Sequence, residues 1–314
     1  MVPTIKPFCG THYNPAKVDD MSSVICPPYD VIDNKLLEVL KRKSSYNFSH
    51  VLLATDNNYR ELGEKFRAWI NNKVLINDKR QSLYLYEQKF SCHGRQYRRF
   101  GFLSLLRMDK KGTVHPHEHT LSKPKEDREK IISEMKTNLS PIFVIIPKPI
   151  EIFTRTYKMY SGKKPLFEFK DTDGNDNSVW KIDDKNLIDK ICAAADKYKL
   201  VIADGHHRFE VSYEYYLKNK DKFKDLNYVL AFVASAQPGL LILPTHRVVD
   251  VKESKDVLMA KLREYFSISK VSRKQLEDKL KRKGIFSFGF YKEGDFYFMK
   301  LKSKKILGKV SGNP

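Results

Sequence analysis

The stretch LVIADGHHRFE at residues 200–210 joins an apolar run to a glycine turn and a polar helix start. Leu200–Ala203 has the length and composition of a buried strand, and Gly205 permits a sharp turn directly after Asp204. We predict a helix over Arg208–Leu217. The backbone N–H groups that follow Gly205 then lie at a helix N-terminus, which is a natural cradle for phosphate.

Charged side chains crowd around the same turn. Arg208 supplies a cation that suits phosphate oxygens, and Glu210 can fix a histidine or the arginine. We predict phosphate or substrate binding for Gly205 and Glu210, and catalytic roles for Asp204, His206, His207 and Arg208. The alternative is that Asp204 only caps the helix and that the histidines are incidental.

A second polar segment, HPHEHTLSKPKEDR, occupies residues 115–128. Pro116 and Pro124 keep most of it out of a helix, so we expect a loop that leads into a helix over Glu126–Asn138. A carboxylate beside histidines can act as a general base, which makes Glu118 and His117 candidate catalytic residues. The side chains suited to phosphate or substrate contacts are Thr120, Lys123, Lys125, Asp127 and Arg128.

The histidines of this segment also allow a metal site. His115, His117 and His119 alternate, so on a strand they would share one face and could ligate zinc. Glu118 would point away from that face, and no fourth ligand has a compelling spacing. The sequence therefore leaves the identity of any metal open.

Two further segments carry site-like residues. LPTHRVV at 243–249 repeats the Thr/His/Arg chemistry after an expected strand, and we expect Thr245, His246 and Arg247 to join the same pocket. PPYD at 27–30 has two interpretations of about equal weight. It is either a rigid turn in which Asp30 caps the next helix or a part of the site.

Helices and strands are mixed along the chain without strict alternation, which predicts an α+β fold. LYLYEQKFSC and GRQYRRFGFLSLLRM predict a hairpin that turns at His93–Gly94. We expect a catalytic region over residues 1–250, with a candidate internal linker at 148–180, where DTDGNDN is a strong turn signal. A smaller lysine-rich α+β segment is expected over 251–314, either a shortened C-terminal region or a fragment.

The composition of the chain limits the compartment and the classes of partner that we expect. Of the 314 residues, 41% are hydrophobic, which is enough to bury a core. The four cysteines lie far apart without CxxC spacing, so we expect free thiols in a reducing compartment. No apolar run approaches the roughly 20 residues that cross a bilayer, and we expect a cytoplasmic protein without membrane contact. The net charge of +20 suits phosphorylated metabolites or nucleic acid, but charge alone does not favour DNA.

Six segments together resemble a family long carried as a domain of unknown function, whose members were often labelled chromosome-partitioning (ParB/SpoOJ-like) proteins. The segment ADGHHR also resembles the phosphate-binding motif of the wider ParB/sulfiredoxin superfamily, which includes the ADP-dependent free serine kinase. The resemblance implies a ParB/sulfiredoxin-like mixed sheet with helices. The six segments are VICPPYDVI at 24–32, the Tyr97–Phe102 strand, HPHEHTLSKPKEDR at 115–128, NLSPIF at 138–143, ADGHHRFE at 203–210 and PGLLILPTHR at 238–247.

This resemblance implies a phosphotransfer enzyme that acts on serine, phosphoserine or a similar small hydroxyl metabolite. It would be a phosphoserine phosphatase or a nucleotide-dependent serine kinase, with Mg²⁺ and with ADP or ATP as the nucleotide. Glu118 would then handle the serine hydroxyl proton. The substrate, the direction of transfer and the oligomeric state are left open.

Two other classes of function share features with this sequence. A ParB-like, CTP-dependent DNA-binding or partitioning protein would use the positive charge, although no convincing helix-turn-helix follows the ADGHHR segment. A sulfiredoxin-type redox enzyme needs a cysteine in the phosphate loop, where this chain has His206–His207. Phosphotransfer is therefore the main functional hypothesis, and DNA binding is the alternative.

Overall fold

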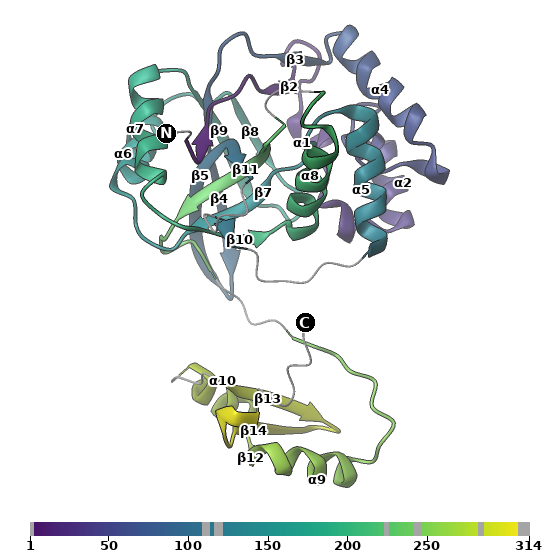
Figure 1. The fold of residues 1–314 in the computed structure, drawn as a ribbon, viewed down its shortest axis with the longest axis vertical. Coiled ribbons are helices and arrows are strands. Elements are labelled where there is room, and N and C mark those ends of the chain that lie inside the picture. Colours follow the sequence, from purple (N-terminus) through teal and green to yellow (C-terminus); the bar gives the residue numbers. More distant parts are fainter. Residues whose placement is uncertain are drawn as a thin grey trace. The chain divides into compact units, whose positions relative to one another are not determined.

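A computed structural model describes residues 3–108, 114–115, 122–222, 226–241, 246–281 and 286–306. The chain divides into two compact units, Met1–Ile242 and Leu243–Pro314, which Figure 1 shows as ribbons. The division falls close to the boundary expected at residue 250. Both units contain helices and sheets, so the predicted α+β class is confirmed.

The first unit is built around one mixed sheet, in which nine strands pair within the described part of the chain. Strand β6 pairs parallel with β10, and β7 pairs parallel with β11, whereas the other pairs are antiparallel. Strand β1 (Ile5–Lys6) joins at β5. In spatial order the remaining strands are β6 (Val114–His115), β10 (Leu200–Asp204), β7 (Ile142–Ile146), β11 (Tyr228–Ser235), β5 (Arg95–Arg107), β4 (Leu83–Cys92), β9 (Asp176–Ile182) and β8 (Phe167–Lys170).

The main core lies between this sheet and helices α6 (Glu151–Tyr160) and α7 (Lys185–Ala195). Phe102 of β5 and Phe153 of α6 are fully buried, and their rings meet edge-on at 4.7 Å between centroids. Burial of each such side chain contributes about 1.5–3 kcal/mol, so this contact fixes α6 on the sheet.

A second group of helices carries residues 122–128 and 206–210 of the two polar segments. Helix α8 (His206–Asn219) contacts β7 and β11, and α5 (Ser122–Met135) packs between α8 and α4 (Tyr59–Asn71), as Figure 1 shows. Ile131 of α5 joins a smaller core around Trp69 of α4. The remaining elements of this layer are β2 (Thr11–Tyr13), β3 (Leu75–Asn77), α1 (Met21–Val24), α2 (Asn34–Lys43), α3 (Ser49–Leu52) and the 3₁₀ turns η1 (Tyr29–Val31) and η2 (Thr55–Asn57).

The expected hairpin is confirmed. Strands β4 and β5 pair in register up to Cys92 and Arg95, and His93 and Gly94 both have positive φ, 50° and 73°. Two consecutive positive φ angles match the right-handed twist of the strands, which is why Gly follows a polar residue here.

Two expectations for the first unit are wrong. Residues 148–180 are not a linker, because α6, β8 and β9 all begin there and both strands belong to the large sheet. The DTDGNDN signal marks only the tight turn between β8 and β9. Helix α5 begins at Ser122 rather than Glu126, because Pro124 lies in the first helical turn, where a missing N–H costs nothing.

The second unit carries a three-stranded antiparallel sheet in the order β12-β14-β13. Strands β13 and β14 form a hairpin, in which pairing runs from Lys292 and Asp295 outward. Among the described residues, no helix has the length and apolar character to cross a membrane. The elements are α9 (Lys255–Tyr265), β12 (Phe266–Val271), α10 (Arg273–Lys281), β13 (Ser287–Lys292), β14 (Asp295–Leu301) and the 3₁₀ turn η3 (Lys304–Ile306).

Candidate functional site

The two polar segments singled out in the sequence lie next to each other. Strand β6 pairs parallel with β10, with Val114 opposite Leu200 and His115 opposite Val201. Parallel neighbours end at the same edge of a sheet, and the helices that come next along the chain, α5 and α8, pack against one another. The structure thus brings the ends of the histidine-rich segment to the turn after β10.

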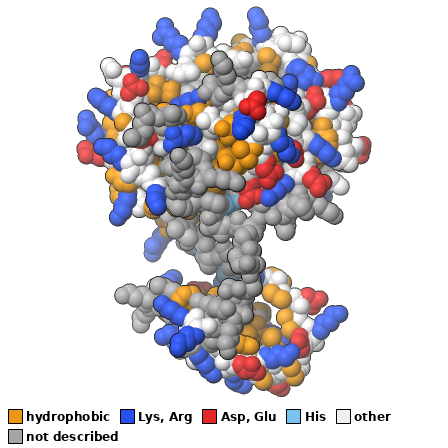
Figure 2. Space-filling model, viewed as in Figure 1, with side chains coloured by type: hydrophobic (Ala, Val, Ile, Leu, Met, Phe, Trp, Pro, Cys, Tyr) orange, Lys and Arg blue, Asp and Glu red, His pale blue; other side chains and the backbone are white. Residues whose placement is uncertain are grey.

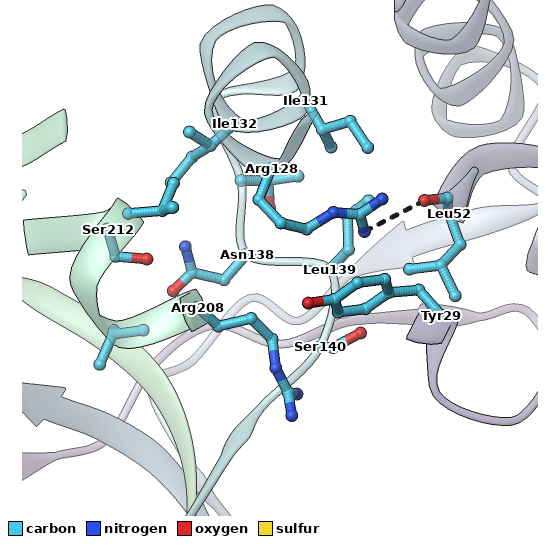
Figure 3. Close-up of a pocket in the computed structure, with 13 residues that line it drawn as sticks. Tyr29, Leu52, Arg128, Ile131, Ile132, Asn138, Leu139, Ser140, Arg208 and Ser212 are labelled. Atoms are coloured by element: carbon cyan, nitrogen blue, oxygen red, sulfur yellow. Dashed lines mark hydrogen bonds between the residues drawn. The ribbon is translucent and has the colours of Figure 1, made fainter. Parts of the chain in front are cut away.

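A cavity of about 50 Å³ lies between α5, α8 and the chain that enters β7. One ordered water needs about 10–15 Å³, so the cavity has room for a few waters or a small anion. Figure 3 shows that Arg128 enters it from α5 and Arg208 from α8. Its polar lining also includes Tyr29, Asn138, Ser140 and Ser212.

Arg128 is held rigidly in the wall of this cavity. Its side chain is 8% exposed, and its Nε donates to Asp127 Oδ2 at 2.9 Å. Nη1 donates to the carbonyl of Leu52 at 3.3 Å, and the guanidinium carbon lies 4.0 Å from the centre of the Tyr29 ring. A hydrogen bond from Tyr59 to Asp127 Oδ1 at 2.8 Å orients the carboxylate in turn.

Arg208 lies one helical turn beyond the end of β10. Its Nη2 donates to Asp204 Oδ2 at 2.5 Å, and its Nη1 donates to the carbonyl of Pro141. The guanidinium turns away from Arg128 in Figure 3, towards these two partners. The Asp204 side chain is 66% exposed, so this pair lies at the surface and stays open to a ligand.

Both arginines influence the pKa of the Tyr29 phenol. Burial raises the pKa of the Tyr29 phenol, while Arg128 and, to a smaller extent, Arg208 lower it. Both guanidinium groups therefore lie within electrostatic reach of one hydroxyl, which Figure 3 shows pointing into the space between them. The phenol stays neutral near pH 7 and can donate a hydrogen bond to an anion.

An ion pair beside the turn links the two helices. Lys125 of α5 forms an ion pair with Glu210 of α8, so Glu210 reaches across to the neighbouring helix. His206 is 5% exposed at the start of α8, and His207 is half-buried beside it. The predicted residues Asp204, Gly205, His206, His207, Arg208, Glu210, Lys125, Asp127 and Arg128 thus gather on adjacent elements.

Gly205, and not Asp204, is the cap residue of α8. Its φ of +92° lies in the left-handed region that favours glycine. A Cβ added here would lie 2.9 Å from Ile142 Cγ2 and 3.0 Å from Arg208 Nη2. The glycine therefore lets Asp204 end the strand and bond Arg208, which corrects the interpretation of Asp204 as a helix cap.

Replacing Gly205 by alanine is expected to destabilise the first unit by more than the ~1–2 kcal/mol that left-handed backbone costs an L-residue, because the contacts add to that strain. The free energy of unfolding in urea measures the effect. Gly174→Ala is a matched control, because Gly174 has φ +79° with nothing within 4 Å. A Gly205→Ala loss no larger than that of Gly174→Ala would show that the close approach is unimportant.

Several predicted residues cannot be placed at the site. His117, His119, Glu118, Thr120 and Thr245 lie outside the described residues, and so does the side chain of Lys123 in α5. His246 and Arg247 are exposed residues of the second unit. Within the ranges that the structure describes, no group of three His, Cys, Asp or Glu side chains is arranged to hold a metal ion.

The cavity also contains residues that the sequence did not single out. Tyr29 belongs to the ambiguous PPYD turn, which the structure places against Arg128. Asn138 and Ser140 belong to NLSPIF, which entered only through the resemblance. Ser212 gave no signal, because a serine in a helix is ordinary.

The fold and the site define an α+β protein with a small, largely apolar cavity that Arg128 and Arg208 line, beside a strand–turn–helix edge. Over residues 5–312 the sequence matches a family described as proteins of unknown function (DUF1015), and the chain belongs to that family. No curated protein and no solved structure shows a significant match to it.

Proposed function

We propose that this protein is a phosphotransfer enzyme that acts on serine, phosphoserine or a similar small hydroxyl metabolite. The observation that carries the proposal is the meeting of Arg128 and Arg208, from two separate sequence segments, around one cavity and one phenol. A transferring phosphoryl group carries spread negative charge, so catalysis depends on positioned cations and donors.

The start of α8 supports the same ligand. It is a 14-residue helix whose first turn follows a left-handed glycine, so the partly positive end of the helix dipole lies close to Arg208. We further propose the finer relationship, a ParB/sulfiredoxin-like fold related to the ADP-dependent free serine kinase. The ADGHHR motif at 203–208 supports this relationship.

The proposed reaction is hydrolysis of phosphoserine, or its counterpart in which a nucleotide phosphorylates serine. In hydrolysis a water oxygen bonds to phosphorus, the phosphorus–oxygen bond to serine breaks, and serine takes up a proton. Arg208 and Arg128 would neutralise the phosphoryl oxygens. His206, His207 or Glu118 would move the proton.

Asp204 and Asp127, the carboxylates that pair with the two arginines, are the candidate ligands for a divalent cation, and one of them fits. Asp204 is mostly exposed and uses only Oδ2 for Arg208, so an oxygen ligand remains for Mg²⁺. Asp127 fits poorly, because Tyr59 occupies Oδ1 and Arg128 occupies Oδ2. Bound Mg²⁺ would neutralise phosphate charge. We propose Asp204 as its ligand, and ADP or ATP as the nucleotide in the kinase direction.

The test of the proposed function measures both directions in the full chain. Phosphate release from phosphoserine, and phosphorylation of serine by ADP or ATP, are assayed with and without Mg²⁺. A ligand that binds the folded state also raises Tm, by an amount set by its concentration relative to Kd. We expect turnover in one direction. If none of these compounds is turned over and none raises the Tm, the proposal is removed.

The alternative, a ParB-like CTP-dependent DNA-binding protein, rests on the net charge of +20. On the face that Figure 2 shows, Lys and Arg are interspersed with Asp and Glu and do not form one continuous stripe. Specific DNA binding would produce a gel shift that weakens steeply with salt.

We also propose a cytoplasmic location, which the four free cysteines support.

A further inference from the structure

Arg98 and Arg99, neighbours on β5, lie on opposite faces of the large sheet. On one face the main core contains Phe102 of β5 and Val229 of β11, and Val229 also lines the cavity described above. Because side chains alternate along a strand, Arg98 projects from the same face as Phe102, and Arg99 projects from the opposite face. The surroundings of Arg99 are therefore separate from the cavity that carries the proposed function.

The two arginines differ in their partners. The Nε of Arg98 lies 2.9 Å from the carboxylate of Glu87, which is 2% exposed. Arg99 instead donates from Nη2 to the amide oxygen of Gln88 at 2.6 Å, and within the described part of the chain no carboxylate pairs with it. Arg98 is thus neutralised by direct contact, whereas Arg99 keeps its charge beside a neutral amide.

Gln88 is fixed in the orientation that turns its oxygen towards Arg99. Its Nε2 donates to Asp171 Oδ2 at 3.0 Å, and Asp171 is held in turn by the backbone N–H of Asn175 at 2.9 Å and by the Asn175 side-chain amide at 3.1 Å. The Asp171 carboxylate therefore acts on the guanidinium only through an amide. Among the described residues, the buried Nε of Arg99 also lacks a hydrogen-bond partner.

The Arg99 guanidinium is a cation that is partly removed from water, and burial lowers its pKa. The nearby Tyr86 phenol donates to Asn177 Oδ1 at 2.6 Å. Burial raises the pKa of this phenol to about 12, so it stays neutral and supplies no counter-charge. A desolvated cation without a counter-ion in contact is unfavourable, and a bound anion would offset that cost.

Aromatic rings from β4, β7 and β11 gather around the guanidinium. Its carbon lies 5.6 Å from the centre of the Phe90 ring and 5.1 Å from that of the Phe143 ring. The Phe143 ring packs at 5.2 Å against Phe232. Gly101 makes room for Phe232, because a Cβ at Gly101 would lie 2.7 Å from Phe232 Cε2. We call this group the Arg99 cluster: Tyr86, Gln88, Phe90, Arg99, Phe143 and Phe232.

We propose that the Arg99 cluster binds a small organic carboxylate with a flat apolar body, at a site separate from the cavity between α5 and α8. A guanidinium forms two parallel hydrogen bonds with a carboxylate, and a flat body can pack against the rings of Phe90 and Phe143. Both rings and the Arg99 side chain are only half-buried, so a ligand can reach them. This site does not depend on the proposed function.

The test compares benzoate with benzamide, which share a flat ring and differ in the charge of one group. Binding to the full chain is measured by calorimetry in wild type, in Arg99→Gln and in Arg95→Gln, an exposed control on the same strand. We expect wild type to bind benzoate more tightly than benzamide. Arg99→Gln should weaken benzoate binding about 10- to 100-fold, the usual range for a charge-assisted hydrogen bond, and Arg95→Gln should leave it unchanged.

Arg208→Gln separates this site from the proposed function. It removes a cation of the cavity on the other face of the sheet, and it is expected to leave the benzoate affinity unchanged. The Arg99 site would be overturned by loss of benzoate binding in Arg208→Gln, by equal affinities in wild type and Arg99→Gln, or by a wild type that does not prefer benzoate. Arg99→Lys, which keeps the charge but loses the fork, replaces Arg99→Gln if that variant unfolds, and it should also weaken benzoate binding.

Discussion

Replacing Arg208 by glutamine is expected to slow phosphate release from phosphoserine by about 100-fold or more. One positioned donor to a developing oxyanion is commonly worth about 10²- to 10³-fold in rate, and here the lost group is also a cation. Arg208 has the geometry for this role, because its bonds to Asp204 and to the Pro141 carbonyl fix its guanidinium at the start of α8.

The measurement is the initial rate of phosphate release at saturating and limiting phosphoserine. Arg60→Gln is the matched control, because Arg60 is 85% exposed and pairs with Glu64 on its own helix. Arg208→Lys is expected to fall between wild type and Arg208→Gln, since lysine keeps the charge without the bidentate fork. If Arg208→Gln and wild type release phosphate at the same rate while both stay folded, Arg208 is not in the site.

Replacing Asp127 by asparagine is expected to destabilise the first unit by about 2–3 kcal/mol. Arg128 is 8% exposed and would lose its carboxylate, and breaking a fully buried pair costs about 3–5 kcal/mol. The expected loss is smaller because the Asp127 side chain is 37% exposed. It corresponds to a Tm lower by roughly 5–10 °C in a unit of this size.

Anion binding gives this variant a second readout. If the cavity binds phosphate beside Arg128, inorganic phosphate should raise the Tm of Asp127→Asn by more than that of wild type, because the anion replaces the lost carboxylate. Glu126→Gln is the control, an exposed carboxylate on the same helix, with an expected change within about 0.5 kcal/mol. Equal phosphate shifts in Asp127→Asn and wild type would argue against an anion at Arg128.

The elements of the site were predictable where local rules suffice. The strand–turn–helix at 200–210 is present as expected, with a left-handed Gly205. Pattern and turn chemistry act over a few residues, so they carry this information directly. The linker at 148–180 failed because a β-turn and an interdomain linker have the same composition, and only strand pairing distinguishes them.

By itself, the sequence determined the mixed α+β elements and the two short segments in which cations, histidines and carboxylates crowd. Only the tertiary structure decided that β6 pairs beside β10, that Tyr29 lies against Arg128, and that Arg98 has a carboxylate partner while Arg99 has none in the described chain. Periodicity is a local property, whereas the order of strands in a sheet is fixed by contacts between residues far apart in the chain. Which charges meet is a consequence of that order.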